Sequence, residues 1–222
     1  MISPITETMV FGWEQALEYY LRWQEEVTPR SFMANHKNQS YFGVMLRLFT
    51  NLDPDHGLFT NIMNVEPKLI KRITYLVIML AALIPALMFR RKIKEPMELS
   101  AILEYSFVLT AIPLLSPIAW KAYFIFLWPG IFISYVLLFR TENDLKKMVL
   151  KRLRIAFWLS MILVIGSAEI FVGPHISDVL ESYSVISAGN TILLVVILNL
   201  VARSDSFEKK SYKLRFQTTR RE

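Results

Sequence analysis

Residues 73–89 read ITYLVIMLAALIPALMF and are followed directly by a basic group, Arg90, Arg91, Lys92 and Lys94. The run contains no charged side chain. As a helix it is long enough to cross most of the apolar core of a bilayer. A helix also satisfies every backbone polar group inside one lipid-exposed segment. The run therefore predicts a transmembrane helix.

Four further apolar runs follow, rich in Leu, Ile, Val and aromatic residues, at residues 99–115, 122–139, 155–172 and 182–202. The chain as a whole is 54% hydrophobic, which is too apolar for a soluble globule of 222 residues. It contains no cysteine, which excludes disulfides and thiolate metal sites. We therefore expect an all-α, polytopic membrane helix bundle with about five transmembrane helices.

Lys and Arg are concentrated in every second loop. There are four in residues 90–98, six in 140–154 and seven in 203–222, against one in 116–121 and none in 173–181. Cytoplasmic loops are enriched in Lys and Arg, so the three basic segments are predicted to be cytoplasmic. The net charge of +6 follows this topology, and no nucleic-acid partner is expected. The chain divides into an outward-facing segment (1–68), a membrane bundle (69–202) and a basic cytoplasmic tail (203–222).

Two helices are predicted in the outward-facing segment. The first begins at Trp13 and places Leu17, Tyr20 and Leu21 on the same face as Trp13, an amphipathic pattern typical of the membrane interface. The second runs from about residue 39 to 49 and ends at the turn residues 51–57. No signal peptide opens the chain although this segment is predicted to lie outside. We therefore expect the C-terminal part of a longer membrane protein, or a first span that inserts with its N-terminus translocated.

Two short motifs resemble a known enzyme family. Residues 38–43 (NQSYFG) with Arg47, and residues 115–123 (LSPIAWKAY), are similar to the NQS-x-x-G-x-x-x-R and SP-[IL]-[SA]-W segments of the polyprenol-phosphate-mannose-dependent membrane mannosyltransferases, glycosyltransferase family 87. The order of spans and loops between the motifs also matches. Both motifs fall in segments that the charge pattern places outside.

The resemblance implies a GT-C fold that transfers a hexose, with mannose as the first candidate, from a polyprenyl-phosphate donor to a lipid or glycan acceptor at the outer leaflet. Family members are longer than this chain, and their catalytic Asp lies in an N-terminal half that it does not contain. The resemblance therefore implies a chain that is inactive without the N-terminal half. The chain would be a fragment, a degenerate remnant, or one part of a split enzyme whose N-terminal half is encoded upstream. Membrane lipids are the other expected partners, and no cofactor is expected.

Arg47 and Lys121 are candidates to bind the donor phosphate. Ser40, Gly43 and Arg47 share one helical face, and Arg binds phosphate oxygens bidentately near a helix N-terminus. The alternative is that Asn38 and Ser40 only cap the helix while Arg47 reaches a lipid headgroup. Lys121 would neutralise the departing phosphate, or would be an ordinary interfacial anchor.

Seven residues are thus predicted to bind donor phosphate or substrate: Asn38, Gln39, Ser40, Arg47, Ser116, Trp120 and Lys121. Glu169 and His175, expected near the outer end of the fourth span, are weaker candidates. Glu104 is expected to reach water from the cytoplasmic end of its span. The three histidines show no metal-ligand spacing, so no metal site is predicted. The catalytic residue itself is not identified.

Two rival functions remain open. A transporter or flippase-like carrier would use the intramembrane acids Glu104 and Glu169 and the prolines Pro85, Pro113 and Pro129 to form a substrate path. Transporters often consist of repeated halves with broken spans, and no such repeat is seen here. A non-catalytic membrane subunit that assembles with a partner is the other alternative.

Overall fold

The computed structural model describes residues 12–26, 34–55, 57–89, 98–141 and 145–204, and every regular element in these ranges is a helix. The α-helices are α2 (Trp13–Glu26), α4 (Tyr41–Phe49), α5 (Pro67–Met88), α6 (Leu99–Leu115), α7 (Trp128–Tyr135), α8 (Lys147–Ile165), α9 (Glu169–Val172), α10 (Pro174–Ser182) and α11 (Val185–Val201). A 3-10 helix, η1 (Lys121–Leu127), precedes α7, and a π-helix, η2 (Val136–Arg140), follows it. The all-α prediction is confirmed for these residues.

Within the described part of the chain, two helices are long and apolar enough to cross a membrane. They are α5, with 22 residues, and the continuous helix Lys121–Arg140, with 20 residues. A third is obtained if α10 and α11, bent by 62° at their junction, are counted as one broken span. The chain is therefore a membrane protein by the length and composition of its helices. The apolar helix α6 has 17 residues.

The fourth predicted span, residues 155–172, does not form one helix. Its helix, α8, begins earlier, at Lys147, so that the basic residues before Ile155 form the first turns of the helix. The helix then ends at Ile165, and the short α9 follows the break. The break falls at Gly166, Ser167 and Ala168, which are small residues that leave the apolar run uninterrupted in the sequence.

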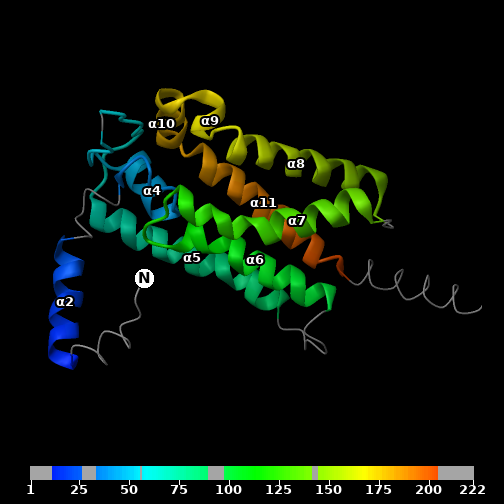
Figure 1. Ribbon diagram of the computed structural model, residues 1–222, viewed down its shortest axis with the longest axis horizontal. Helices are drawn as coiled ribbons and strands as arrows, with labels where there is room; N and C mark the ends of the chain where they lie inside the picture. The colour runs from blue at the N-terminus through cyan, green and yellow to red at the C-terminus, as the bar shows by residue number, and fades with distance from the viewer. Residues whose placement is uncertain (1–11, 27–33, 56, 90–97, 142–144, 205–222) are drawn as a thin grey trace, which may run out of the picture.

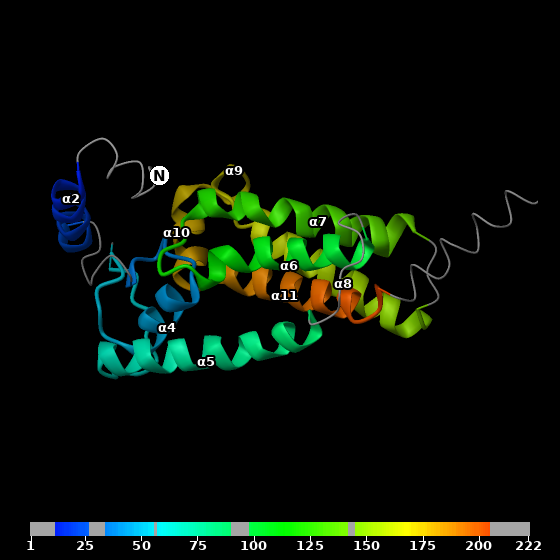
Figure 2. The same ribbon diagram turned by 90° about the horizontal axis from the view of Figure 1, so that it is seen from below.

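Helices α5, α6, α8 and α11 and the helix from η1 to η2 run roughly along one axis and alternate in direction (Figures 1 and 2). The core is formed around α11, whose fully buried side chains include Leu193, Val196 and Ile197. Leu103 of α6 and Phe157 of α8 belong to the same buried cluster. Burial of these apolar side chains holds α6, α7 and α8 against α11.

Small residues let α11 approach its neighbours closely. A Cβ added to Gly189 would lie 2.8 Å from Val164 Cγ2 of α8, so a larger residue does not fit. Ser160 Oγ of α8 donates a hydrogen bond of 2.7 Å to the Gly189 carbonyl. Small residues and hydrogen bonds from hydroxyls are the usual means of packing helices within a bilayer. By contrast, α5 exposes a row of large apolar side chains, as expected of a surface that contacts lipid.

The predicted second helix of the N-terminal segment is confirmed as α4, which packs on the first turns of α5 through Leu46 and Ile70. Figure 2 shows α4, α9 and α10 at one end of the bundle, where α6 ends and η1 begins. The ends of α5, η2 and α11 lie at the opposite end. The predicted first helix is confirmed as α2, whose Trp13 and Leu21 are exposed.

Candidate functional site

The two sequence motifs are hydrogen-bonded to each other. Asn38 Oδ1 accepts from the Ala119 amide at 2.9 Å, and Asn38 Nδ2 donates to the Pro117 carbonyl at 3.1 Å. The backbone N–H of Gln39 donates to the Ala119 carbonyl at 2.8 Å, and Ser40 Oγ donates to the Pro117 carbonyl at 3.2 Å. The NQS residues therefore hold the loop between α6 and η1 against the start of α4.

Local backbone chemistry explains why these residue types occur in this order. Ser40 is the N-cap of α4, and its Oγ accepts from the Gly43 amide at 3.1 Å. Asn38 Oδ1 also accepts from the Ser40 amide at 3.1 Å. A Cβ at Gly43 would lie 2.5 Å from the Asn38 carbonyl oxygen, so only glycine fits beside Asn38. The capping alternative is thus confirmed for Ser40.

Gln39 connects the same segment to α10 and α11. Its Nε2 donates to the carbonyl oxygens of His36 at 2.7 Å and Glu181 at 2.9 Å. Ser187 Oγ donates to the backbone carbonyl oxygen of Gln39 at 2.6 Å and lies 3.0 Å from Gln39 Oε1. Gln39 is fully buried, so its amide stabilises the bend between α10 and α11 and is not presented to a ligand.

Arg47 is also buried, with 2% of its surface exposed. Its Nη1 donates to the carbonyl oxygens of Asn35 and Asn38, both at 2.7 Å, and its Nη2 donates to Ser184 Oγ at 2.8 Å. Burial lowers the pKa of Arg47 to about 10, partly offset by the charge of Glu181, so the guanidinium stays protonated at neutral pH. The phosphate contact predicted from the sequence would require it to leave these partners. The observed contacts give Arg47 a structural role instead.

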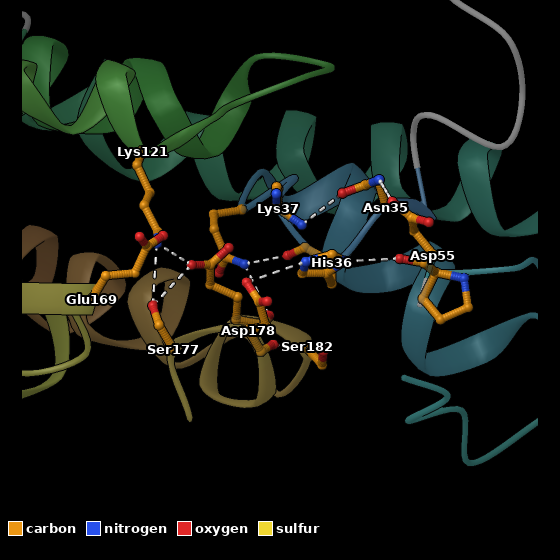
Figure 3. Close-up of polar contacts among 12 residues, drawn as sticks. Asn35, His36, Lys37, Asp55, Lys121, Glu169, Ser177, Asp178 and Ser182 are labelled. Carbon is orange, nitrogen blue, oxygen red and sulfur yellow. Dashed lines mark hydrogen bonds and ion pairs between the residues drawn. The ribbon is translucent and has the colours of Figure 1, made fainter. Parts of the chain in front are cut away.

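Lys121 lies at the centre of a charged network (Figure 3). Its Nζ is 2.8 Å from Glu169 Oε1 and 2.5 Å from Glu181 Oε1, and it donates to Ser177 Oγ at 3.1 Å. Glu181 is fully buried, whereas the Glu169 side chain is 56% exposed. The network therefore joins the start of η1 to α9 and α10. Binding of a donor phosphate by Lys121 stays a prediction.

The structure corrects the expected positions of two acids. Glu169 was predicted inside the fourth span, but it is the first residue of α9, beyond the break that ends α8. Glu104 was predicted to reach water, but only 8% of its surface is exposed. Lys121 lowers the pKa of Glu169 from its ordinary value of 4.5, through a hydrogen bond and its charge.

This shift gives the protein a contribution to stability that depends on pH. Because folding lowers the pKa of Glu169, the contribution is present above pH 4.5 and is lost as the pH falls through the lower value in the folded state. Glu169→Gln removes the titrating group. We expect the Tm of this variant to lie below that of the wild type at pH 7 and to approach it as the pH falls below 4.5, so that its Tm depends less on pH in that range. Identical pH profiles would contradict the ion pair.

A second group of polar residues, missed from the sequence, lies beside this network. His36 is fully buried, and its Nε2 is 3.6 Å from Asp178 Oδ1 of α10. Glu181 follows Asp178 by one helical turn, and one potential ligand atom from each of these three residues lies within 4.8 Å of the others. The spacing of Asp178 and Glu181 places both on one helical face. This spacing is the feature of the sequence from which the pair of carboxylates could have been predicted.

The remaining predicted residues lie near the network without joining it. Ser116 Oγ donates to the Ile118 carbonyl within its own loop at 2.7 Å. Trp120, directly before Lys121, is 45% exposed. His175 is exposed near the start of α10.

Comparisons of this chain with protein-family models, with curated proteins and with solved structures found no match.

Proposed function

We propose that this chain is the C-terminal part of an integral-membrane glycosyltransferase of the GT-C type. It would transfer a hexose, with mannose as the first candidate, from a polyprenyl-phosphate donor to a lipid or glycan acceptor at the outer leaflet. In this proposal the five spans are α5, α6, the helix from η1 to η2, α8 and the bent pair α10–α11. Their basic ends face the cytoplasm, and the N-terminal segment lies outside.

The observation that supports this proposal best is the direct pairing of the two family-like motifs. Asn38 and Ser40 are hydrogen-bonded to Pro117 and Ala119 although 77 to 81 residues separate them in the sequence. Two motifs that only capped separate helices would have no reason to meet. Their meeting point also adjoins Lys121, the one cation of the loop 116–121.

The chemistry expected at this end of the bundle is stabilisation of a departing phosphate. Displacement at the anomeric carbon of the sugar leaves a negative charge on the polyprenyl phosphate, and a nearby cation stabilises that charge. The three N–H groups of the Lys121 ammonium are directed at Glu169, Glu181 and Ser177, so in this proposal the departing phosphate replaces the exposed carboxylate of Glu169. In this proposal Arg47 does not contact the phosphate. It holds the backbone carbonyls of Asn35 and Asn38 in place. The catalytic acid would come from outside this chain.

Sugar transfer in isolated membranes tests this proposal. The chain alone and the chain co-expressed with the product of the gene immediately upstream are given a polyprenyl-phosphate donor with labelled mannose. We expect transfer only from the pair, and a loss of about 100-fold per inserted protein in Lys121→Met, the size typical of losing one charge-stabilising donor. Lys121→Arg should keep part of the activity.

Lys68→Met is the matched control, because Lys68 is exposed on α5 and belongs to the same outer end. It should transfer sugar at the wild-type rate. Correct insertion without transfer, by the chain alone and by the pair, would overturn the proposal.

One observation favours a carrier as the second candidate. The pair α10–α11 is bent by 62°, and broken helices often line the substrate sites of transporters. Uptake of a labelled substrate into vesicles that contain the chain, together with no sugar transfer, would favour the carrier.

A further inference from the structure

The orientation of the His36 ring restricts what its second nitrogen can bind. His36 Nδ1 is 3.1 Å from the Pro54 carbonyl oxygen, which can only accept a hydrogen bond, so Nδ1 carries the proton. In the neutral ring Nε2 therefore presents a lone pair, and it faces the carboxylate of Asp178 at 3.6 Å. A lone pair facing a carboxylate is favourable when a cation lies between them. A histidine held by a carbonyl on its other nitrogen is also the usual arrangement in metal sites.

The buried carboxylate of Glu181 provides an independent observation. Its Oε1 contacts Lys121 and Ser177, the latter at 3.2 Å, but its Oε2 has no hydrogen-bond partner among the described residues. Glu181 is fully buried. A buried carboxylate oxygen without a donor is costly. A bound cation would remove this cost.

The charges of the cluster point the same way. The carboxylates of Glu169 and Glu181 pair with the ammonium of Lys121, whereas the carboxylate of Asp178 faces His36 (Figure 3). Arg47 adds positive charge nearby, but its guanidinium is bound to backbone carbonyls and to Ser184. Among the described residues, Asp178 has no Lys or Arg within ion-pair distance, so a cation bound between it and His36 would balance its charge.

We propose that His36 Nε2, Asp178 and Glu181 bind one divalent transition-metal ion. Tetrahedral ligands of Zn²⁺ at about 2.1 Å from the ion lie about 3.4 Å from one another. The separation of 3.6 Å between His36 and Asp178 is close to this value, and the ligand atoms of the whole set lie within 4.8 Å of one another, so the set would contract around the ion. The Asp178 side chain is 30% exposed, so a water molecule can take the fourth position. An imidazole ligand with two carboxylates favours Zn²⁺ or Mn²⁺ over Ca²⁺.

Isothermal titration of the full chain in detergent micelles, after treatment with a chelator, tests this site with Zn²⁺ as the probe. We expect one Zn²⁺ to bind per chain. Asp178→Asn should weaken binding at least 10-fold, since even residues that only support a metal ligand contribute about 10- to 100-fold to affinity. This variant keeps the shape of a partly exposed side chain and should fold.

Asp55→Asn is the matched control. Asp55 is exposed, and it accepts a hydrogen bond from Asn35 at 3.2 Å outside the cluster. It should bind Zn²⁺ like the wild type. Glu181→Gln is a second ligand variant. Its unfolding temperature is measured without metal, to show that the variant folds, and its affinity for Zn²⁺ is then measured in the same way.

Absence of saturable Zn²⁺ binding by the folded wild type would overturn the metal site. Equal affinity in the wild type, Asp178→Asn and folded Glu181→Gln would overturn it as well. Because the readout is direct binding, the result does not depend on whether the chain takes part in sugar transfer.

Discussion

Arg47→Ala should lower the free energy of unfolding by about 3–5 kcal/mol, which is the cost typical of breaking a buried charged network. The guanidinium is 2% exposed and donates to two backbone carbonyls and to Ser184. Removing it takes one donor from each of the carbonyl oxygens of Asn35 and Asn38 and from Ser184, and opens a cavity. Thermal unfolding in detergent should show a fall of about 10 °C in Tm for a chain of this length.

The result separates the two roles considered for this residue. If Arg47 bound a donor phosphate, Arg47→Ala would abolish donor binding and leave Tm near the wild-type value. If it holds the backbone, Tm falls whether donor is present or absent. Arg47→Lys keeps a charge but cannot reach three acceptors in the same geometry, so we expect an intermediate Tm.

Arg22→Ala is the matched control for charge removal. Arg22 pairs with Glu18 at 3.7 Å on α2, and the two side chains are 65% and 64% exposed. Exposed pairs of this kind contribute about 0–1 kcal/mol. An equal Tm for Arg47→Ala and Arg22→Ala would contradict the structural role of Arg47.

The sequence pattern predicted the helices of the bundle better than their ends. Residues 73–88 lie within α5, whose C-cap is Phe89, and residues 99–115 coincide with α6. The prediction of one helix over residues 155–172 was wrong, because an apolar run shows where lipid contact is favourable but does not show where a helix breaks. The break at residues 166–168 consists of small residues that also occur inside membrane helices.

The candidate site was predicted in part, since local motifs and distant contacts differ in what a sequence shows. The capping role of Ser40 follows from its spacing to Gly43, and the structure contains that contact. The meeting of His36 with Asp178 and Glu181 depends on how α10 folds back toward the N-terminal segment. No periodicity or motif connects residues so far apart. Their grouping required the tertiary structure.

Gly43→Ala should have the second-largest effect, about 2–4 kcal/mol, because it adds a methyl group where the backbone of Asn38 already lies. The new Cβ would be 2.5 Å from the Asn38 carbonyl oxygen and 2.7 Å from its Cγ. Asn38 must then move, and it would lose its hydrogen bonds to Pro117 and Ala119. Overpacking costs about 1–3 kcal/mol, and each buried hydrogen bond that is lost adds to it.

Gly57→Asn is the control for replacing a glycine. An added Cβ at Gly57 meets nothing within 4 Å, and Asn tolerates its positive φ of 67°. We expect its Tm to be close to that of the wild type, while Gly43→Ala falls by several degrees.

The pairing of the motifs also predicts where Gly43→Ala loosens the fold. Protease cleavage or hydrogen exchange should increase first in the loop at residues 116–120, although the substitution is in α4, because Asn38 makes two of the hydrogen bonds between them. Increased exchange confined to α4 would mean that the hydrogen bonds of Gln39 and Ser40 hold the loop without those of Asn38.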